Sequence, residues 1–284
     1  MTSDQEAKLP RLTKFAVYAA LIMLSIPAIL PLLWMVSTSL KTNAQIFGNG
    51  DLNLKALIPS PLETSNYPAA LQNMPFLVYL RNTLLLCIFG VVGAVTSSAV
   101  VAYGFAKIEF PGRNTLFGLM IATMALPGQV TMIPIFSLFR SLGWYGSYLP
   151  LIVPAFTASA YYVFLLTQFF KTIPTEMSEA ARVDGATEWR IFLQLIIPLS
   201  RPALATCALF QFIGTWNDFL GPLLYLNDPA KYTLAYGLQQ FVSHYGGFFA
   251  QLMAAATIFT LPIIILFFFA QRTFIQGIST TGGK

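Results

Sequence analysis

Long stretches without a single charged residue recur along this chain. Uncharged runs of 26, 25, 26 and 30 residues occupy positions 15–40, 82–106, 114–139 and 141–170. A bilayer core about 30 Å thick is crossed by roughly 20 helical residues, so each run is long enough to span a membrane. Only 10% of the residues are charged, against about 25% in an ordinary soluble domain. These runs exclude a small soluble globular fold.

Two more apolar stretches follow later in the chain, at 201–225, where Asp218 interrupts the run, and at 249–271. Together the six stretches predict an all-α polytopic membrane protein with no soluble core domain. The six transmembrane helices are expected at about 14–39, 81–106, 114–139, 149–170, 201–225 and 249–271.

The basic residues predict how these helices are oriented. With the N-terminus in the cytoplasm, 11 of the 16 lysines and arginines fall on the inner side, which is the usual bias of membrane proteins. Both termini are therefore expected inside, with a tail at 1–13, a transmembrane domain at 14–275 and a tail at 276–284. The charges sit at membrane boundaries rather than in one basic stripe, so lipid is the expected environment and nucleic acid is not an expected partner.

The densest group of charges lies in the middle of the chain, where positions 176–190 hold six of the 27 charged residues. Gly185 interrupts a run of good helix formers there, and Thr187 can cap a second helix. The loop 171–200 is thus expected to form two short cytoplasmic helices that meet at a glycine bend. The second helix has an apolar face. Helices that lie on a lipid surface usually carry a strongly basic polar face, so the mixed charges here favour docking of the apolar face into a protein groove.

At this segment the sequence resembles a known family. Glu179-Ala180-Ala181, three residues, Gly185, nine residues and then Leu-Ile-Ile-Pro at 195–198 resemble the EAA loop of binding-protein-dependent ABC importer permeases. The family pattern ends in I-x-L-P, so this chain differs by exchanging Leu and Ile at positions 195 and 197.

The resemblance extends to the second permease subunit of maltose-type carbohydrate importers. It is carried by short segments in the order found there, at 66–67, 81–84, 102–113, 133–143, 215–223 and 277–284. The final segment, GISTTGGK, departs from the usual G-A-V-K-G ending.

The resemblance implies a multi-pass protein of the bacterial cytoplasmic (inner) membrane and a set of partners. These are a second permease subunit, a dimeric cytoplasmic ATPase that receives the EAA coupling helix, and an extracytoplasmic solute-binding protein. Residues expected at the ATPase are Glu179, Ala180, Ala181, Asp184, Gly185, Thr281 and Lys284. The loop 227–248 resembles one that reaches toward the sugar site of the binding protein.

No catalytic site is expected in this chain. A phosphate-binding loop needs G-x-x-x-x-G-K-[ST], and the sequence has no such run. ATP and magnesium are therefore expected on the partner ATPase, and this chain is expected to bind no cofactor and no metal.

Asp218 is a second candidate for function, because a carboxylate within an apolar span is costly and often marks a transport pathway. It shares one helical face with Gln211, Thr215 and Pro222, at intervals of i, i+4, i+7 and i+11. The sequence therefore nominates a substrate path formed by Gln211, Trp216, Asn217 and Asp218. The alternative is that Asp218 caps or pairs with a structural group near the outer interface.

Three classes of function remain open from the residues. An ATP-driven permease for a sugar or a sugar-like solute fits the EAA spacing and the flanking segments, and a permease for a non-sugar solute shares the EAA loop. An ion-coupled secondary transporter fits less well, because only one intramembrane carboxylate and no evident inverted repeat occur. A non-transporting scaffold would not need the EAA spacing.

Overall fold

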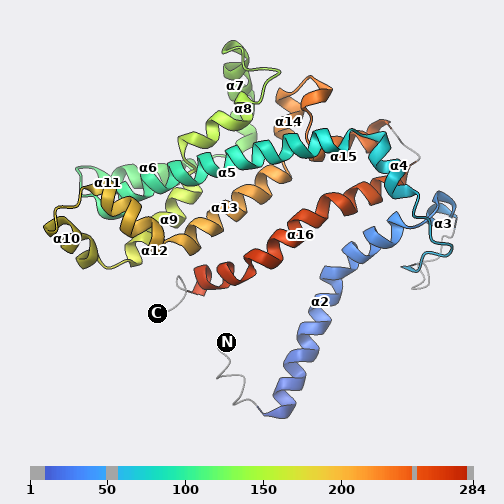
Figure 1. Ribbon diagram of the computed structural model, residues 1–284, viewed down its shortest axis with the longest axis horizontal. Helices are drawn as coiled ribbons and strands as arrows, with labels where there is room; N and C mark the ends of the chain where they lie inside the picture. The colour runs from blue at the N-terminus through green and yellow to red at the C-terminus, as the bar shows by residue number, and fades with distance from the viewer. Residues whose placement is uncertain (1–9, 49–56, 245–247, 280–284) are drawn as a thin grey trace. The chain divides into compact units, whose positions relative to one another are not determined.

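The chain is almost entirely helical in a computed structural model that describes residues 10–48, 57–244 and 248–279, and these residues contain no β-strand (Figure 1). It divides into two compact units. The first comprises residues 1–74 and 240–260, and the second comprises residues 75–239 and 261–284. The second unit carries both the charged segment and the Asp218 region.

The helices of the first unit are α2 (Arg11–Ser39), α3 (Asn43–Phe47) and α4 (Asn66–Asn73). Those that begin the second unit are α5 (Phe76–Lys107), α6 (Arg113–Thr123), α7 (Gly128–Ser141), α8 (Leu149–Ile152), η2 (Val153–Thr157) and α9 (Ala160–Thr172). It continues with α10 (Thr175–Val183), α11 (Glu188–Ile191), η3 (Phe192–Ile196), α12 (Ile197–Leu199), α13 (Arg201–Trp216), α14 (Leu220–Tyr225) and η4 (Pro229–Lys231). Two helices, α15 (Leu234–His244) and α16 (Phe249–Ser279), have residues in both units.

Four helical stretches are long and apolar enough to cross a membrane, at Leu12–Ser39, Phe76–Lys107, Leu149–Thr172 and Phe249–Phe269. Two pairs of shorter helices pass the same test together but are sharply bent. The α6–α7 pair bends by 94°, and Glu188–Leu199 bends by 78° against α13. Among the described residues there are thus four to six candidate spans, which agrees with a polytopic membrane protein.

The third predicted span is not one straight helix. The backbone tightens into i→i+3 hydrogen bonds at Met124, Ala125 and Leu126, and α7 begins after Pro127. Proline has no N–H to donate and disfavours helical geometry in the residue before it, so the chain turns there. The expectation of a continuous helix over 114–139 was wrong for this reason. The second span also begins earlier than predicted, at Phe76 instead of position 81.

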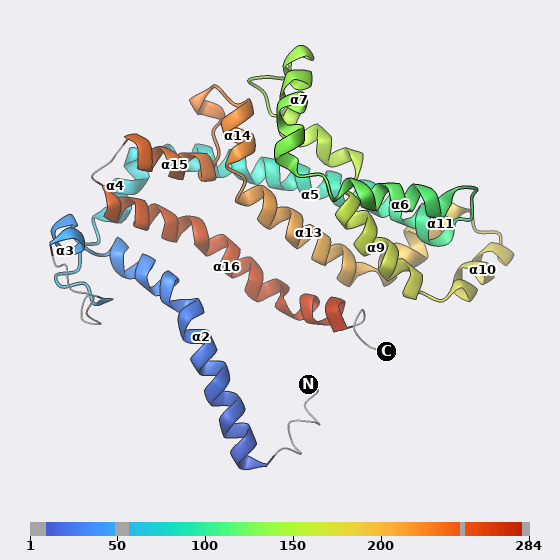
Figure 2. The ribbon, with the colours of Figure 1, turned by 180° about the vertical axis from the view of Figure 1, so that it is seen from behind.

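The core of the second unit is built on α5, with α9 and α13 packed along it (Figure 2). Small residues of α5 allow close approach: a Cβ atom at Gly90 would lie 3.2 Å from Thr215 Oγ1 of α13, and one at Gly93 would lie 2.7 Å from the ring of Phe156 in η2. The small residues at 90–99 thus permit tight helix packing. Phe170 and Leu166 of α9 are fully buried in the same core.

The fourth span is interrupted near its middle, where Ala158 has a left-handed backbone with φ of 65°. The Ser97 hydroxyl of α5 accepts the Ala158 N–H at 3.1 Å, and the Ser98 hydroxyl accepts the Ser159 N–H at 3.0 Å. Backbone groups released by a break inside a membrane must find polar partners. The two serines supply them, which stabilises a short 3₁₀ helix where a continuous helix was expected.

The segment after α14 is fixed to the start of α5. The buried Asn82 side chain donates to the carbonyl groups of Ala230 and Tyr232 at 2.9 and 3.0 Å, and Thr83 accepts the Leu234 N–H at 2.9 Å. A loop was expected over 227–248, but the structure forms α15 within it. The fully buried Leu234 begins that helix.

Candidate functional site

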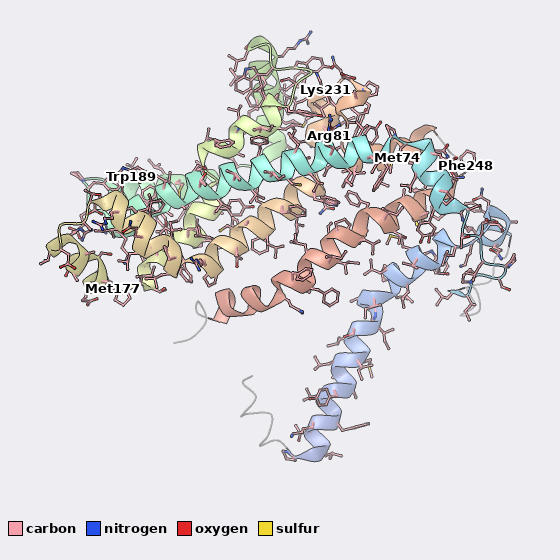
Figure 3. All side chains as sticks on the ribbon, in the orientation of Figure 1. Met74, Arg81, Met177, Trp189, Lys231 and Phe248 are labelled. Carbon is pink, nitrogen blue, oxygen red and sulfur yellow. The ribbon has the colours of Figure 1, made fainter. Side chains whose placement is uncertain are left out.

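The charged segment forms the two short helices that the sequence predicts, α10 and α11, separated by a bend at Gly185. They lie together at one end of the second unit, where Figure 3 labels Met177 and Trp189. The Thr187 hydroxyl accepts the Arg190 N–H and caps α11, as expected.

The bend is a Schellman motif centred on a left-handed glycine. Gly185 has φ of 80°, its N–H bonds to the Arg182 carbonyl at 3.0 Å, and the Ala186 N–H bonds to the Ala181 carbonyl at 2.9 Å. These two bonds satisfy carbonyl groups that the end of α10 would otherwise leave unpaired. No atom lies within 4 Å of a Cβ at Gly185, so the backbone angle alone requires glycine there.

A chain of polar contacts fastens α10 to α11 and both to α5. Arg182 Nε lies 2.7 Å from Glu188 Oε1, and the Tyr103 hydroxyl donates to Glu188 Oε2 at 2.5 Å. The hydrogen bond from Arg182 lowers the pKa of Glu188, aided by the bond from Tyr103 and opposed by desolvation. We call Tyr103, Arg182 and Glu188 the coupling link.

Two residues at the end of α5, Tyr103 and Lys107, hold the charged segment in place, and the sequence analysis did not nominate them. Besides Tyr103, Lys107 donates from Nζ to the Ile173 carbonyl at 2.6 Å, just before α10. Both belong to the 102–113 segment noted for its resemblance, but nothing in the sequence reveals which groups they contact. Those contacts depend on how α5 and the loop pack together.

The apolar face that begins at α11 is buried within this chain, whereas the sequence predicted that it docks into a groove of a partner protein. Ile191, Phe192 and Ile196 are buried in the core of this same chain, in contact with α5 and α9. Because they are buried, they are not free to fill a groove on a partner. The large apolar side chains that stay exposed in this region include Val183, at 88%, and Trp189, at 62%.

The predicted ATPase-facing residues lie on the outer surface of this segment. Glu179, Ala180, Asp184 and Gly185 are exposed, whereas Ala181 is half-buried against the core. Thr281 and Lys284 lie outside the described residues.

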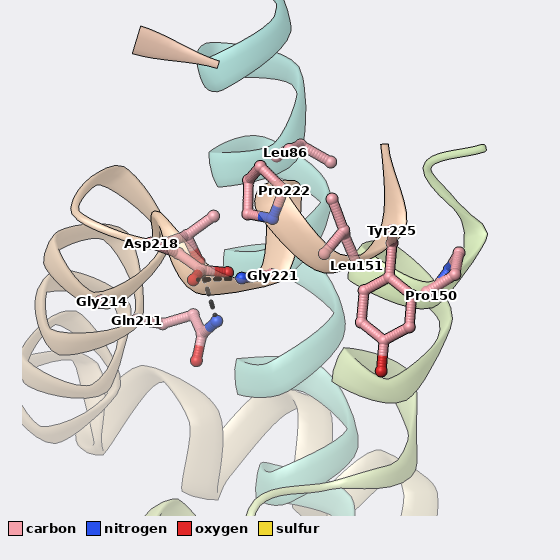
Figure 4. A pocket seen from close by; sticks show the side chains of 10 residues that line it. Leu86, Pro150, Leu151, Gln211, Gly214, Asp218, Gly221, Pro222 and Tyr225 are labelled. Atoms are coloured by element: carbon pink, nitrogen blue, oxygen red, sulfur yellow. Dashed lines mark hydrogen bonds between the residues drawn. The ribbon is translucent and has the colours of Figure 1, made fainter. Parts of the chain in front are cut away.

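A second feature is an open cavity of about 390 Å³ at the far end of α13 from the coupling link. Figure 4 shows Gln211 and Asp218 on one side of it and Pro150, Leu151 and Tyr225 on the other. The four residues expected on one helical face all line the cavity: Gln211, Thr215, Asp218 and Pro222. The expectation of one continuous helix through them was wrong, because α13 ends at Trp216 and α14 begins at Leu220, so only Gln211 and Thr215 lie on the same helix.

The polar groups of the cavity are held in place by local hydrogen bonds. Gln211 Nε2 donates to Thr215 Oγ1 at 3.0 Å, and Asp218 Oδ1 accepts the Gly221 N–H at 2.9 Å in the first turn of α14. Asp218 therefore caps α14. A Cβ atom at Gly221 would lie 2.4 Å from Asp218 Oδ2, so the missing side chain lets the carboxylate approach the helix closely.

Trp216 and Asn217, the other two nominated substrate-path residues, are not part of the cavity lining. Trp216 is buried, and its ring stacks on Phe212 with centroids 5.5 Å apart. Asn217 is exposed and donates to the Ile213 carbonyl of its own helix at 2.8 Å. The structure thus brings two of the four nominated residues together and separates the others from them.

We expect Trp216→Ala to lower stability and to leave solute affinity unchanged. Removing this buried ring leaves a cavity and costs about 3–5 kcal/mol of unfolding free energy. The measurement is the thermal unfolding midpoint of the purified subunit, with Leu220→Ala at an exposed position as the control. An unchanged thermal unfolding midpoint together with a raised KM for transport would instead indicate that Trp216 takes part in solute binding.

Comparison with known proteins agrees with these features. Residues 94–280 match the family described as binding-protein-dependent transport system inner membrane component. The chain is 33% identical to the arabinooligosaccharides transport system permease protein AraQ of Bacillus subtilis, over 92% of each chain. It is 31% identical to the maltose/maltodextrin transport system permease protein MalG of Escherichia coli, over 93% of this chain and 94% of that one.

A solved structure has the same fold over nearly the whole length. It is the crystal structure of a bacterial ABC transporter involved in the import of the acidic polysaccharide alginate. One of its chains superposes with a TM-score of 0.80 at 25% identity, covering 92% of this chain and 96% of that chain. The protein is therefore a member of the family of inner-membrane components of binding-protein-dependent transport systems, and it is similar to sugar ABC permeases along almost its entire length.

Proposed function

We propose that this chain is the permease subunit of an ATP-driven importer for a sugar. It forms the translocation path with a second permease, and an extracytoplasmic binding protein delivers the solute. The observation that carries the proposal is the exposed α10 helix with its glycine bend, linked to the long helix α5 through Tyr103 and Glu188. The sugar assignment is supported by the relatives, which are named for arabinooligosaccharides, diacetylchitobiose, trehalose and maltose.

The proposed topology has six spans with both termini in the cytoplasm. Four spans are the long apolar helices, the bent pair α6–α7 supplies the third span, and α13 supplies the fifth without the helices at Glu188–Leu199 that precede it. The excess of basic residues on the side of the termini supports this orientation. The helices α10 to α12 then lie in the cytoplasm between spans four and five, and the 390 Å³ cavity lies toward the outer side.

In this arrangement α10 docks on a separate ATPase, which binds ATP and magnesium. Glu179, Ala180 and Asp184 are exposed for that contact, and the tail residues Thr281 and Lys284 are proposed to extend it. Closure of the ATPase dimer displaces α10. The coupling link is short and hydrogen-bonded at both ends, so it passes that displacement to α5 instead of absorbing it.

The test is reconstitution of the permease pair with its ATPase and binding protein in liposomes. ATP hydrolysis is measured with a panel of maltose, trehalose, diacetylchitobiose and an arabinooligosaccharide, and separately with amino acids. Uptake is measured with the solute that stimulates most. We expect one of these sugars to stimulate hydrolysis and to be taken up only with ATP. Stimulation by amino acids alone would overturn the sugar assignment, and uptake driven by an ion gradient without ATP would overturn the mechanism.

A further inference from the structure

We propose that the cavity between α5, α8, α13 and α14 is a subsite of this chain that binds one ring of an uncharged sugar. Its polar groups are the amide of Gln211, the hydroxyl of Thr215 and the carboxylate of Asp218. The inference rests on the proposed import of a sugar and adds a binding site and a charge preference to it.

The cavity has the size and lining expected of a small-molecule site. At about 390 Å³ it falls within the range of roughly 300–1,000 Å³ that ligand pockets occupy, where apolar walls surround a few polar groups. Pro150, Leu151, Pro222 and Tyr225 supply apolar surface. A sugar ring presents C–H faces that pack on such surface and a rim of hydroxyls that needs hydrogen bonds.

Asp218 is a carboxylate without a cationic partner. No lysine or arginine forms an ion pair with it among the residues that the structure describes, where Arg182 and Glu188 form the salt bridge. The carboxylate accepts the Gly221 N–H and is also hydrogen-bonded by the Leu220 backbone, and it lines the cavity. A desolvated carboxylate needs hydrogen-bond donors, and sugar hydroxyls are donors that add no charge.

Gln211 and Thr215 extend this polar edge along α13. The amide of Gln211 uses one N–H on the Thr215 hydroxyl, which leaves a second N–H and the carbonyl oxygen for a ligand. Gly90 of α5 faces the pair, since a Cβ there would lie 3.2 Å from Thr215 Oγ1. The absence of a side chain at Gly90 lets α5 pack closely against the amide and the hydroxyl, so that both are held at this edge of the cavity.

The position of the cavity fits a path through the membrane. Gln211 lies ten residues after Arg201, where α13 begins, and thus about 15 Å along the helix from its cytoplasmic end. Asp218 lies just beyond the outer end of this helix, which ends at Trp216. On the proposed topology a sugar released from the binding protein meets Asp218 first and Gln211 next.

The charge of the lining predicts which sugars enter. The cavity contains one carboxylate and no lysine or arginine, so it repels uronic acids and sugar phosphates and favours uncharged saccharides. The proposed preference for uncharged sugars differs from the acidic polysaccharide in whose import the structurally similar transporter is involved.

The experiment uses the complete reconstituted complex and three variants of this chain. Asp218→Asn keeps an acceptor oxygen for the Gly221 N–H but removes the charge, so we expect the KM for uptake to rise about tenfold or more. Thr215→Val and Gln211→Leu remove neutral groups and should raise the KM by about two- to tenfold with little change in kcat. The matched control is Thr206→Val, which makes the same substitution on α13 at a hydroxyl bonded to the Pro202 carbonyl, away from the cavity.

The probes are the four uncharged sugars of the panel and a uronic-acid oligosaccharide. A raised KM in the cavity variants, with a normal KM in Thr206→Val, would support the subsite. Wild-type KM values in Asp218→Asn and Thr215→Val, or a wild-type preference for the acidic oligosaccharide, would overturn it while leaving sugar import intact. If no saccharide stimulates the wild-type complex, the sugar assignment itself fails and the subsite fails with it. Should Asp218→Asn not assemble, Thr215→Val and Gln211→Leu decide the question.

Discussion

Replacing Gly185 with valine is expected to reduce solute uptake at least about tenfold. The backbone at this position has φ of 80°, which costs a residue with a Cβ roughly 1–2 kcal/mol and a β-branched residue more. To avoid that strain, the end of α10 must give up the two Schellman hydrogen bonds and change the angle between α10 and α11. The ATPase would then meet a helix in the wrong orientation.

The measurement for Gly185→Val is uptake per ATP hydrolysed, together with the amount of ATPase that co-purifies with the permease. Gly185→Asn should restore most of the activity, because asparagine tolerates the left-handed conformation better than other non-glycine residues. Gly118→Val is the matched control: a Cβ at Gly118 in α6 meets no atom within 4 Å and its φ is not positive. Full uptake and normal ATPase recovery in Gly185→Val would contradict the role of the bend.

Glu188→Ala should separate ATP hydrolysis from transport. Its carboxylate accepts from both Arg182 and Tyr103, so its loss unfastens α10 and α11 from α5 while the surface of α10 stays intact. We expect the ATPase to remain bound and active, with uptake per ATP lower by about fivefold or more, because the partly exposed ion pair with Arg182 contributes up to about 1 kcal/mol and the bond from Tyr103 adds to it. Tyr103→Phe removes only one of these bonds and should show a smaller loss.

A double-mutant cycle of Tyr103→Phe and Glu188→Gln provides the sharpest measurement, since non-additive losses show that the two side chains act together. Glu109→Ala, at an exposed carboxylate in the turn after α5, is the charge control. Additive losses of uptake per ATP in the double-mutant cycle would refute the joint action of Tyr103 and Glu188. Uptake per ATP at the wild-type level in Glu188→Ala would refute it as well.

The link also has a pH signature with a defined sign. The pKa of Glu188 is lowered below its ordinary value of 4.5, mainly by the hydrogen bond from Arg182. The stability that the carboxylate contributes is therefore complete above pH 4.5 and is lost as the pH falls through the lowered pKa. Hydrogen exchange across 175–191 should differ between wild type and Glu188→Gln at neutral pH and converge in acid.

The sequence alone determined the class of the molecule and the place of its charged segment with the glycine bend. Uncharged runs as long as a bilayer is thick leave few alternatives to membrane-spanning helices, because backbone groups in lipid must bond within their own segment. Gly185 and Thr187 specify a helix end and a helix start through local backbone chemistry, which needs no knowledge of distant residues. The shared face of Gln211 and Thr215 on α13 followed from helical periodicity for the same reason.

Only the tertiary structure decided how those elements meet. The bends at Pro127 and Ala158 depend on which distant groups satisfy the released backbone, as Ser97 and Ser98 do for Ala158. The link from Glu188 to Tyr103 joins residues 85 positions apart, and no local pattern encodes such a pairing. The cavity likewise excludes Trp216 and Asn217 although they lie between its members in sequence, because the helix turns their side chains toward the core and back along the helix. Helix periodicity fixes which side chains share a face, and packing fixes what that face contacts.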